Sequence, residues 1–169
     1  MRGSVSHFIY YLLVFTLQVI VGNHFDGWVW LHLCFIPLIL IGFPPNWDVR
    51  ISMAVAFGLG LVADLATGGV PGINAAAAVL LAALKDPLYR ALVSPDGQNP
   101  AWIPTVRSLG TWTYLKYALA LYAVYLLVYV LLDAFSLRPV FFILGKTVLS
   151  ILLSVALAAL LSLFLPEKD

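Results

Sequence analysis

The chain has 169 residues, of which 63% are hydrophobic and only 10% are charged, and its formal net charge is +1. A water-soluble domain of this length could not bury so much apolar surface, so the composition argues for an integral membrane protein. The few basic residues are scattered along the chain and do not form a basic stripe, so we expect no nucleic-acid partner.

Six apolar stretches have the composition of membrane-spanning helices. A helix needs roughly 20 apolar residues to cross about 30 Å of hydrocarbon, and the second, third and fourth stretches are shorter than this. Long apolar runs without regular alternation favour a helical bundle over a barrel. We therefore predict a single all-α transmembrane domain over residues 1–169, a bundle of six transmembrane helices with spans at approximately 5–22, 28–43, 51–66, 70–84 (or as far as 93), 114–132 and 140–165.

The positions of lysine and arginine predict the orientation of these spans. If the N-terminus is cytoplasmic, seven basic residues lie on or near the cytoplasmic side, and only Arg138 and Lys146 lie on the other. This bias agrees with the positive-inside rule, so both termini are predicted to be cytoplasmic. The first stretch lacks a small-x-small cleavage site after a short core and is interpreted as an uncleaved span.

The third predicted span ends in a carboxylate and a run of glycines. It reads Gly58-Leu-Gly-Leu-Val-Ala-Asp64-Leu-Ala-Thr-Gly68-Gly69-Val-Pro71-Gly72. An ionised Asp near the middle of a spanning helix costs roughly 2.5–3.5 kcal/mol on insertion scales, so Asp64 requires either a partner or a use. Counting from a cytoplasmic boundary near Ile51, Asp64 is predicted roughly 20 Å across the membrane, in its outer half.

Three interpretations of Asp64 follow from the residues alone. The carboxylate accepts hydrogen bonds from amide groups that are freed where the backbone leaves helical geometry between Thr67 and Gly72, and this needs no ligand. Alternatively, it pairs with a neighbouring helix, or it handles a proton or an ion.

After the fourth span, the longest polar connection runs from about 86 to 113. It contains a dense turn signal over residues 94–100. Because Pro87 follows Asp86, we interpret Asp86 as the cap of a short separate helix that extends through Ala91.

The last predicted span carries small residues at every fourth position. Such a spacing places them on one helix face, where a neighbouring backbone can approach closely. The face is expected to pack within this chain, with a contact to another protein as the alternative. Its members are Ser150, Ser154, Ala158 and Ser162.

The sequence shows no constellation that indicates catalysis or metal binding. There is no nucleophile elbow and no phosphate-binding glycine loop beside a lysine. His24 and His32 are eight residues apart, which is not a metal-ligand spacing, and Cys34 is the single cysteine. We expect no enzyme activity, no cofactor and no bound metal.

The stretch from Gly58 to Ala78 resembles the MreD family of rod shape-determining proteins. The pattern is glycine, apolar residues, Asp, Leu and then two further glycines before an alanine-rich helix. Length, helix number and orientation agree over nearly the whole chain. The matching positions are Gly60, Asp64, Leu65, Gly69 and Gly72, and with Gly68 they are the candidate structural or interaction residues.

The resemblance implies a role in bacterial cell elongation. MreD proteins are non-enzymatic, multi-pass subunits of the cytoplasmic (inner) membrane that associate with the bitopic protein MreC. Together they connect MreB filaments to the RodA peptidoglycan polymerase and its transpeptidase partner. The chain is accordingly expected to act as an interaction scaffold in the lipid bilayer.

A second family gives an alternative function. Substrate-binding subunits of energy-coupling-factor vitamin transporters also have six helices with both termini inside, and MreD is thought to be related to them in architecture. In that case an outward-facing pocket would be lined by His24, Trp28, Trp30, His32 and Asp64. The first helix, however, lacks the small-xxx-small face by which such subunits dock on their coupling protein.

Overall fold

The computed structural model describes residues 2–25, 33–43, 47–68, 70–93, 104–133 and 140–163. Over these ranges the chain forms seven α-helices and no strand, which confirms the all-α prediction for this part of the chain. The helices are α1 (Arg2–Phe25), α2 (Ile36–Ile41), α3 (Val49–Thr67), α4 (Ile73–Leu92), α5 (Val106–Leu109), α6 (Thr111–Asp133) and α7 (Val140–Ser162).

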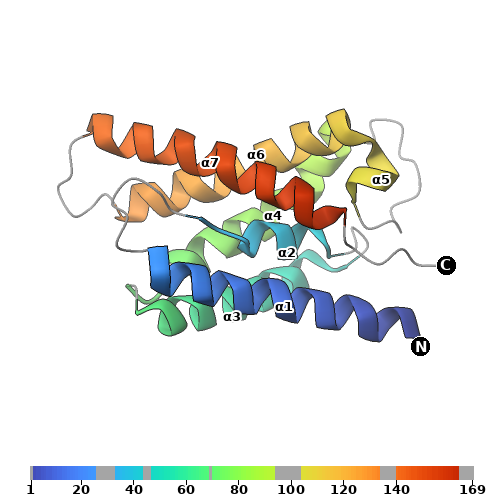
Figure 1. Cartoon of the computed structure of the whole chain (residues 1–169), viewed down its shortest axis with the longest axis horizontal. Coiled ribbons are helices and arrows are strands. Elements are labelled where there is room, and N and C mark those ends of the chain that lie inside the picture. Colours follow the sequence, from blue (N-terminus) through green and yellow to red (C-terminus); the bar gives the residue numbers. More distant parts are fainter. Residues whose placement is uncertain are drawn as a thin grey trace.

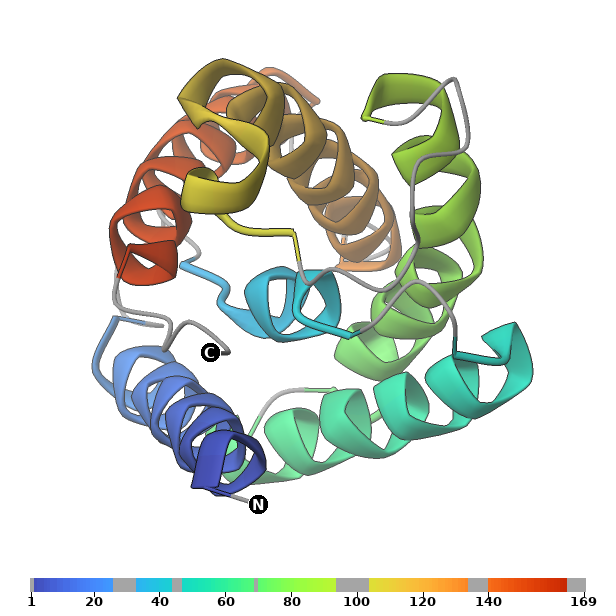
Figure 2. The same ribbon diagram turned by 90° about the vertical axis from the view of Figure 1, so that its right-hand side faces the viewer.

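The five long helices form a ring around the short helix α2. Figure 1 shows that α1, α3, α4, α6 and α7 lie lengthwise along one axis, and Figure 2 shows α2 enclosed by them. The first residues of α1, the last residues of α7 and the short helix α5 lie at one end of the bundle, and the turn between α3 and α4 lies at the other. The ring closes between α1 and α7, where the Tyr10 hydroxyl donates a hydrogen bond to the Leu161 carbonyl at 2.8 Å.

Helix α2 is the centre of the hydrophobic core. All six of its residues are buried, and Pro37 in its first turn already has the backbone angle that a helix start requires. Residues 33–35 are not helical, and 28–32 lie outside the described residues. The structure thus corrects the predicted span over 28–43, because a helix of about 9 Å cannot cross a membrane by itself.

The fourth predicted span is one helix, α4, which covers Ile73–Leu92 without a break. Pro87 lies inside this helix, and Asp86 precedes it by one residue in the same helix. The interpretation of Asp86 as the cap of a separate helix is therefore wrong.

Besides its apolar core, the structure exposes many large apolar side chains and buries several polar ones, which is unusual for a water-soluble protein. Two helices, α3 and α6, are long and apolar enough to cross a membrane, and α1 and α7 contain the shorter apolar stretches Ile9–Asn23 and Thr147–Ser162. Large apolar side chains are exposed on all four helices, whereas polar side chains are buried among them. Exposed examples are Leu13, Leu65, Leu127 and Leu152, and buried examples are Gln18, Asp64, Asn74 and Ser154.

Candidate functional site

The Asp64 carboxylate lies against the first turn of α4 and accepts hydrogen bonds from it. Asp64 Oδ2 accepts from the backbone N–H groups of Gly72 at 2.8 Å and Ala75 at 3.3 Å. Asp64 Oδ1 accepts from the backbone N–H of Asn74 at 3.1 Å and from the Asn74 side-chain amide at 2.8 Å. The carboxylate is only 1% exposed, so water does not compete with these bonds.

The start of α4 needs such a partner, because the first N–H groups of a helix have no acceptor within the helix. Gly72 occupies the N-cap position and has no side chain that could accept. Asp64 supplies the missing acceptor from the preceding helix, and its negative charge is favoured at the positive end of the helix dipole. This geometry matches the first interpretation, since the backbone N–H groups of Gly72 and of Asn74 and Ala75 just beyond it hold the carboxylate. The side-chain amide of Asn74 adds the contact with a neighbouring helix that the second interpretation described.

Two glycines give the turn between α3 and α4 its shape. Gly68 ends α3 with φ of 68°, and its N–H donates to the backbone carbonyl of Asp64. Gly72 begins α4 with φ of 104°. Both angles are unfavourable for residues with a side chain. Gly69 lies outside the described residues.

Gly60 allows α3 and α4 to approach closely beside this turn. A Cβ atom at Gly60 would lie 2.4 Å from the Cα of Ala75 and 2.6 Å from its nitrogen, which is closer than packed atoms come. A Cβ at Gly58, two residues earlier, would meet nothing within 4 Å. Gly60, Asp64 and Gly72 therefore meet at one place, which we call the α3–α4 junction. Leu65, in contrast, is 66% exposed.

A third helix is tied to the junction through Asn74. The hydroxyl of Tyr125 in α6 donates to Asn74 Oδ1, and the Tyr125 side chain is fully buried. Sequence reasoning did not include Tyr125 among the site residues. A signal was present, however, because the buried tyrosines of α6 follow helical spacing on one face; they are Tyr114, Tyr117, Tyr122 and Tyr125.

The small-residue face of α7 is turned inward. All four of its members, Ser150, Ser154, Ala158 and Ser162, are buried. Ser154 Oγ accepts a hydrogen bond from the backbone N–H of Cys34 at 3.3 Å, and Gln18 Oε1 in α1 accepts from the N–H of Phe35. Side chains of α7 and α1 thus satisfy the backbone that leads into α2. The burial of this face is what packing within the chain, the first of its two alternatives, predicts.

The geometry of the junction suits a structural role. A carboxylate offers about four acceptor positions, and the chain itself occupies four at Asp64. No acceptor position is left for an ion or a substrate. Within the part of the chain that the structure describes, no three His, Cys, Asp or Glu side chains cluster as metal ligands. The side chain of His24 and the residues Trp28, Trp30 and His32 lie outside that part.

Comparisons of the chain with protein-family models, with curated proteins and with solved structures found no match. What the chain does must therefore be inferred from its own residues and their geometry.

Proposed function

We propose that this protein is a non-enzymatic membrane subunit of the bacterial cell-elongation complex, of the MreD type, and that it binds an MreC-like bitopic protein. One observation carries the proposal. The residues on which the resemblance to MreD depends, Gly60, Asp64 and Gly72, meet at the α3–α4 junction and have complementary roles there. This protein and its MreC-like partner would together connect MreB to RodA and to the transpeptidase that works with RodA.

In this proposal the bundle lies in the cytoplasmic membrane as a multi-pass protein with both termini inside. The apolar side chains exposed on α1, α3, α6 and α7 support the placement, because lipid is the solvent that such a surface matches. The basic residues Arg50, Arg90 and Arg107 lie near the end of the bundle that holds the start of α1 and the end of α7. Six membrane segments then include α2, which is shielded from lipid by its neighbours.

The matched residues divide into a buried set and an exposed one. Gly60, Asp64 and Gly72 hold α3 against α4, so substitutions there would disturb the fold and would report little about a partner. Leu65 is exposed and lies on a line of exposed residues along α3. We define the outer face of α3 as Ala54, Gly58, Val62 and Leu65. Two small residues on this face would let a partner's transmembrane helix approach closely.

The substitution Gly58→Leu tests this face without touching the core. A side chain at Gly58 meets no atom of the chain within 4 Å, and leucine favours the helix by about 1 kcal/mol over glycine. We expect the variant to reach normal membrane levels, to recover at least about tenfold less MreC-like partner, and to impair rod shape, since about 1.4 kcal/mol of binding energy is a factor of ten.

Ala156→Leu is the matched control, because Ala156 is exposed on α7 and the same side chain is added there. It should recover the partner normally. If Gly58→Leu also recovers the partner normally, the outer face of α3 is not the binding surface. If the unmodified protein recovers no MreC-like partner at all, the proposed function itself fails.

The transporter subunit remains the rival proposal, and the junction argues against it. Among the residues assigned to a vitamin pocket, Asp64 is the one whose side chain the structure describes, and its acceptor positions are occupied by α4. A vitamin retained by the purified protein would reverse this preference.

A further inference from the structure

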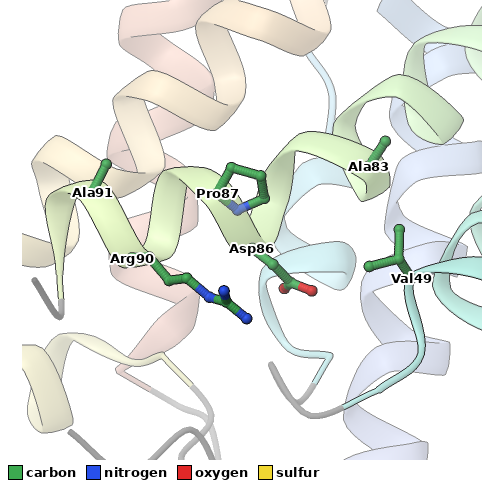
Figure 3. A pocket seen from close by; sticks show the side chains of 6 residues that line it. All are labelled: Val49, Ala83, Asp86, Pro87, Arg90 and Ala91. Atoms are coloured by element: carbon green, nitrogen blue, oxygen red, sulfur yellow. The ribbon is translucent and has the colours of Figure 1, made fainter. Parts of the chain in front are cut away.

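A pocket opens at the end of the bundle opposite to the α3–α4 junction. It has a volume of about 670 Å³ and lies between the first residue of α3 and the second half of α4. Figure 2 shows that these two helices diverge toward this end. Its lining residues are Val49, Ala83, Asp86, Pro87, Arg90 and Ala91 (Figure 3). The fourth span is predicted to end at residue 84 or as far as 93, so the pocket lies close to the expected cytoplasmic membrane surface.

One wall of the pocket carries hydrogen-bond acceptors that lack donors. Asp86 Oδ1 is buried and has no hydrogen-bond partner among the described residues. Lys85 Nζ forms an ion pair with Asp86 Oδ1 at 3.8 Å, a distance too long for a hydrogen bond, and it donates its hydrogen bond to the Phe43 carbonyl at 3.1 Å. Pro87 has no N–H, so the Ala83 carbonyl also loses its usual donor in the helix.

Arg90 supplies donors on the same side of α4. It is exposed and lies one helical turn after Asp86, and Figure 3 shows both side chains extending to the same side of the helix. Within the described residues no ion pair joins Arg90 to Asp86. A guanidinium group matches the oxygens of a phosphate, whereas the acceptors at Asp86 and Ala83 match an N–H donor.

We propose that this pocket binds the headgroup of a phospholipid that carries a primary ammonium group, of the phosphatidylethanolamine class. The ammonium donates to the Asp86 carboxylate and the Ala83 carbonyl, and the phosphate accepts from Arg90. The acyl chains extend along α4 past Leu80, which is 42% exposed and lies on the same helix face as Ala83 and Pro87. This inference depends on the membrane placement proposed above, but it does not depend on the MreC-like partner.

The balance of charge in the pocket favours a zwitterion over an anionic lipid. Among the lining residues, Asp86 and Arg90 contribute one charge of each sign, and Lys85, which does not line the pocket, is paired with Asp86 at 3.8 Å. An anionic headgroup without an ammonium would leave Asp86 Oδ1 without a donor and would bring like charges together. A choline headgroup has the same charge as ethanolamine but no N–H to donate. Comparing the retention of the two lipids therefore measures the contribution of the hydrogen bond apart from that of the charge.

The test measures retention of defined lipids by the purified full-length protein, by native mass spectrometry after exchange into mixed micelles. Phosphatidylethanolamine should be retained about tenfold better than phosphatidylcholine or phosphatidylglycerol, as expected for one charge-assisted hydrogen bond. Asp86→Asn should remove the preference for ethanolamine over choline. Arg90→Gln should lower the retention of all three lipids. Lys116→Gln removes an exposed charge from α6 outside the pocket and should change nothing.

Equal retention of the three lipids by the unmodified protein would overturn the proposal even if no variant folds. A preference that survives Asp86→Asn would overturn the role of Asp86. Full displacement by soluble glycerophosphoethanolamine, which has the headgroup without acyl chains, would assign the pocket to a soluble phosphate ester instead. Loss of partner recovery with intact lipid preference would leave this inference standing while the elongation role fails.

Discussion

At the scale of single residues, Asp64 shows how a long apolar helix can hold a buried carboxylate without a metal or a basic partner. The first turn of α4 gives it three backbone N–H groups and one side-chain amide. Bonds of this kind to a charged group contribute about 1.5–3 kcal/mol each, so together they offset the cost of burying the charge. The same bonds satisfy the start of α4, and each side of the contact therefore stabilises the other.

This reciprocity predicts a loss of stability in Asp64→Asn. An asparagine replaces one acceptor oxygen with a donor, so two N–H groups at the start of α4 lose their acceptor whichever way the amide is turned. Each such buried group costs about 1–3 kcal/mol, and we expect the free energy of unfolding to fall by about 2–4 kcal/mol in detergent micelles. Denaturant titration followed by circular dichroism measures it.

Asp48→Asn is the control for that experiment. Asp48 is an exposed N-cap that accepts from the Arg50 N–H at 2.9 Å, and asparagine caps a helix about as well as aspartate. This variant should change stability by less than about 0.5 kcal/mol. Equal effects of the two substitutions would contradict the assignment of Asp64 as the acceptor that secures α4.

The sequence predicted the contact of Asp64 with freed amides because the glycines that free them follow it directly. Its link to Tyr125 could not be predicted in the same way. Tyr125 is 51 residues from Asn74, and the approach of their helices depends on packing that no local pattern encodes. The close approach at Gly60 likewise follows from the crossing of α3 and α4, since Gly58 is equally small and faces open space.

At the scale of elements, α2 shows the limit of counting apolar residues. Apart from His32, the predicted span 28–43 is apolar, and a single polar residue does not mark a face that would distinguish a lipid-facing helix from a core helix. Pro37 near the start of α2 was the local sign of a late helix start. Full burial of α2 depends on five surrounding helices, so it became visible only in the assembled bundle.

The inward face of α7 gives a prediction at this scale. Ala158 is fully buried, whereas Ala156, two residues earlier on the same helix, is exposed. Ala158→Leu forces three extra carbon atoms into a packed interior and should lower the free energy of unfolding by about 1–3 kcal/mol. Ala156→Leu adds the same atoms toward lipid and should be silent. If both variants unfold together with the unmodified protein, α7 does not pack through this face.

At the scale of the whole molecule, the bundle has apolar residues both in its core and on its exterior, and its polar network lies inside. Gln18, Ser154, Asp64 and Asn74 join α1, α7, α3 and α4 to neighbouring segments, while leucines and valines cover the exterior. In lipid, exposed apolar side chains give no drive for helices to associate, so internal hydrogen bonds and close packing of small residues must hold the helices together. Both are present here.

In the proposed membrane placement, the two ends of α3 lie on opposite sides of the membrane. Trp47 precedes α3, and Val70 follows it in the turn between α3 and α4. Both residues are exposed, and they lie at opposite ends of α3. With both termini cytoplasmic, Val70→Cys should react with a membrane-impermeant thiol reagent in intact cells. Trp47→Cys should react only after the membrane is opened. The unmodified protein serves as the control, because its single cysteine, Cys34, is fully buried and should not react in either case. The opposite labelling pattern would invert the topology and would place the Asp86 pocket on the outer surface.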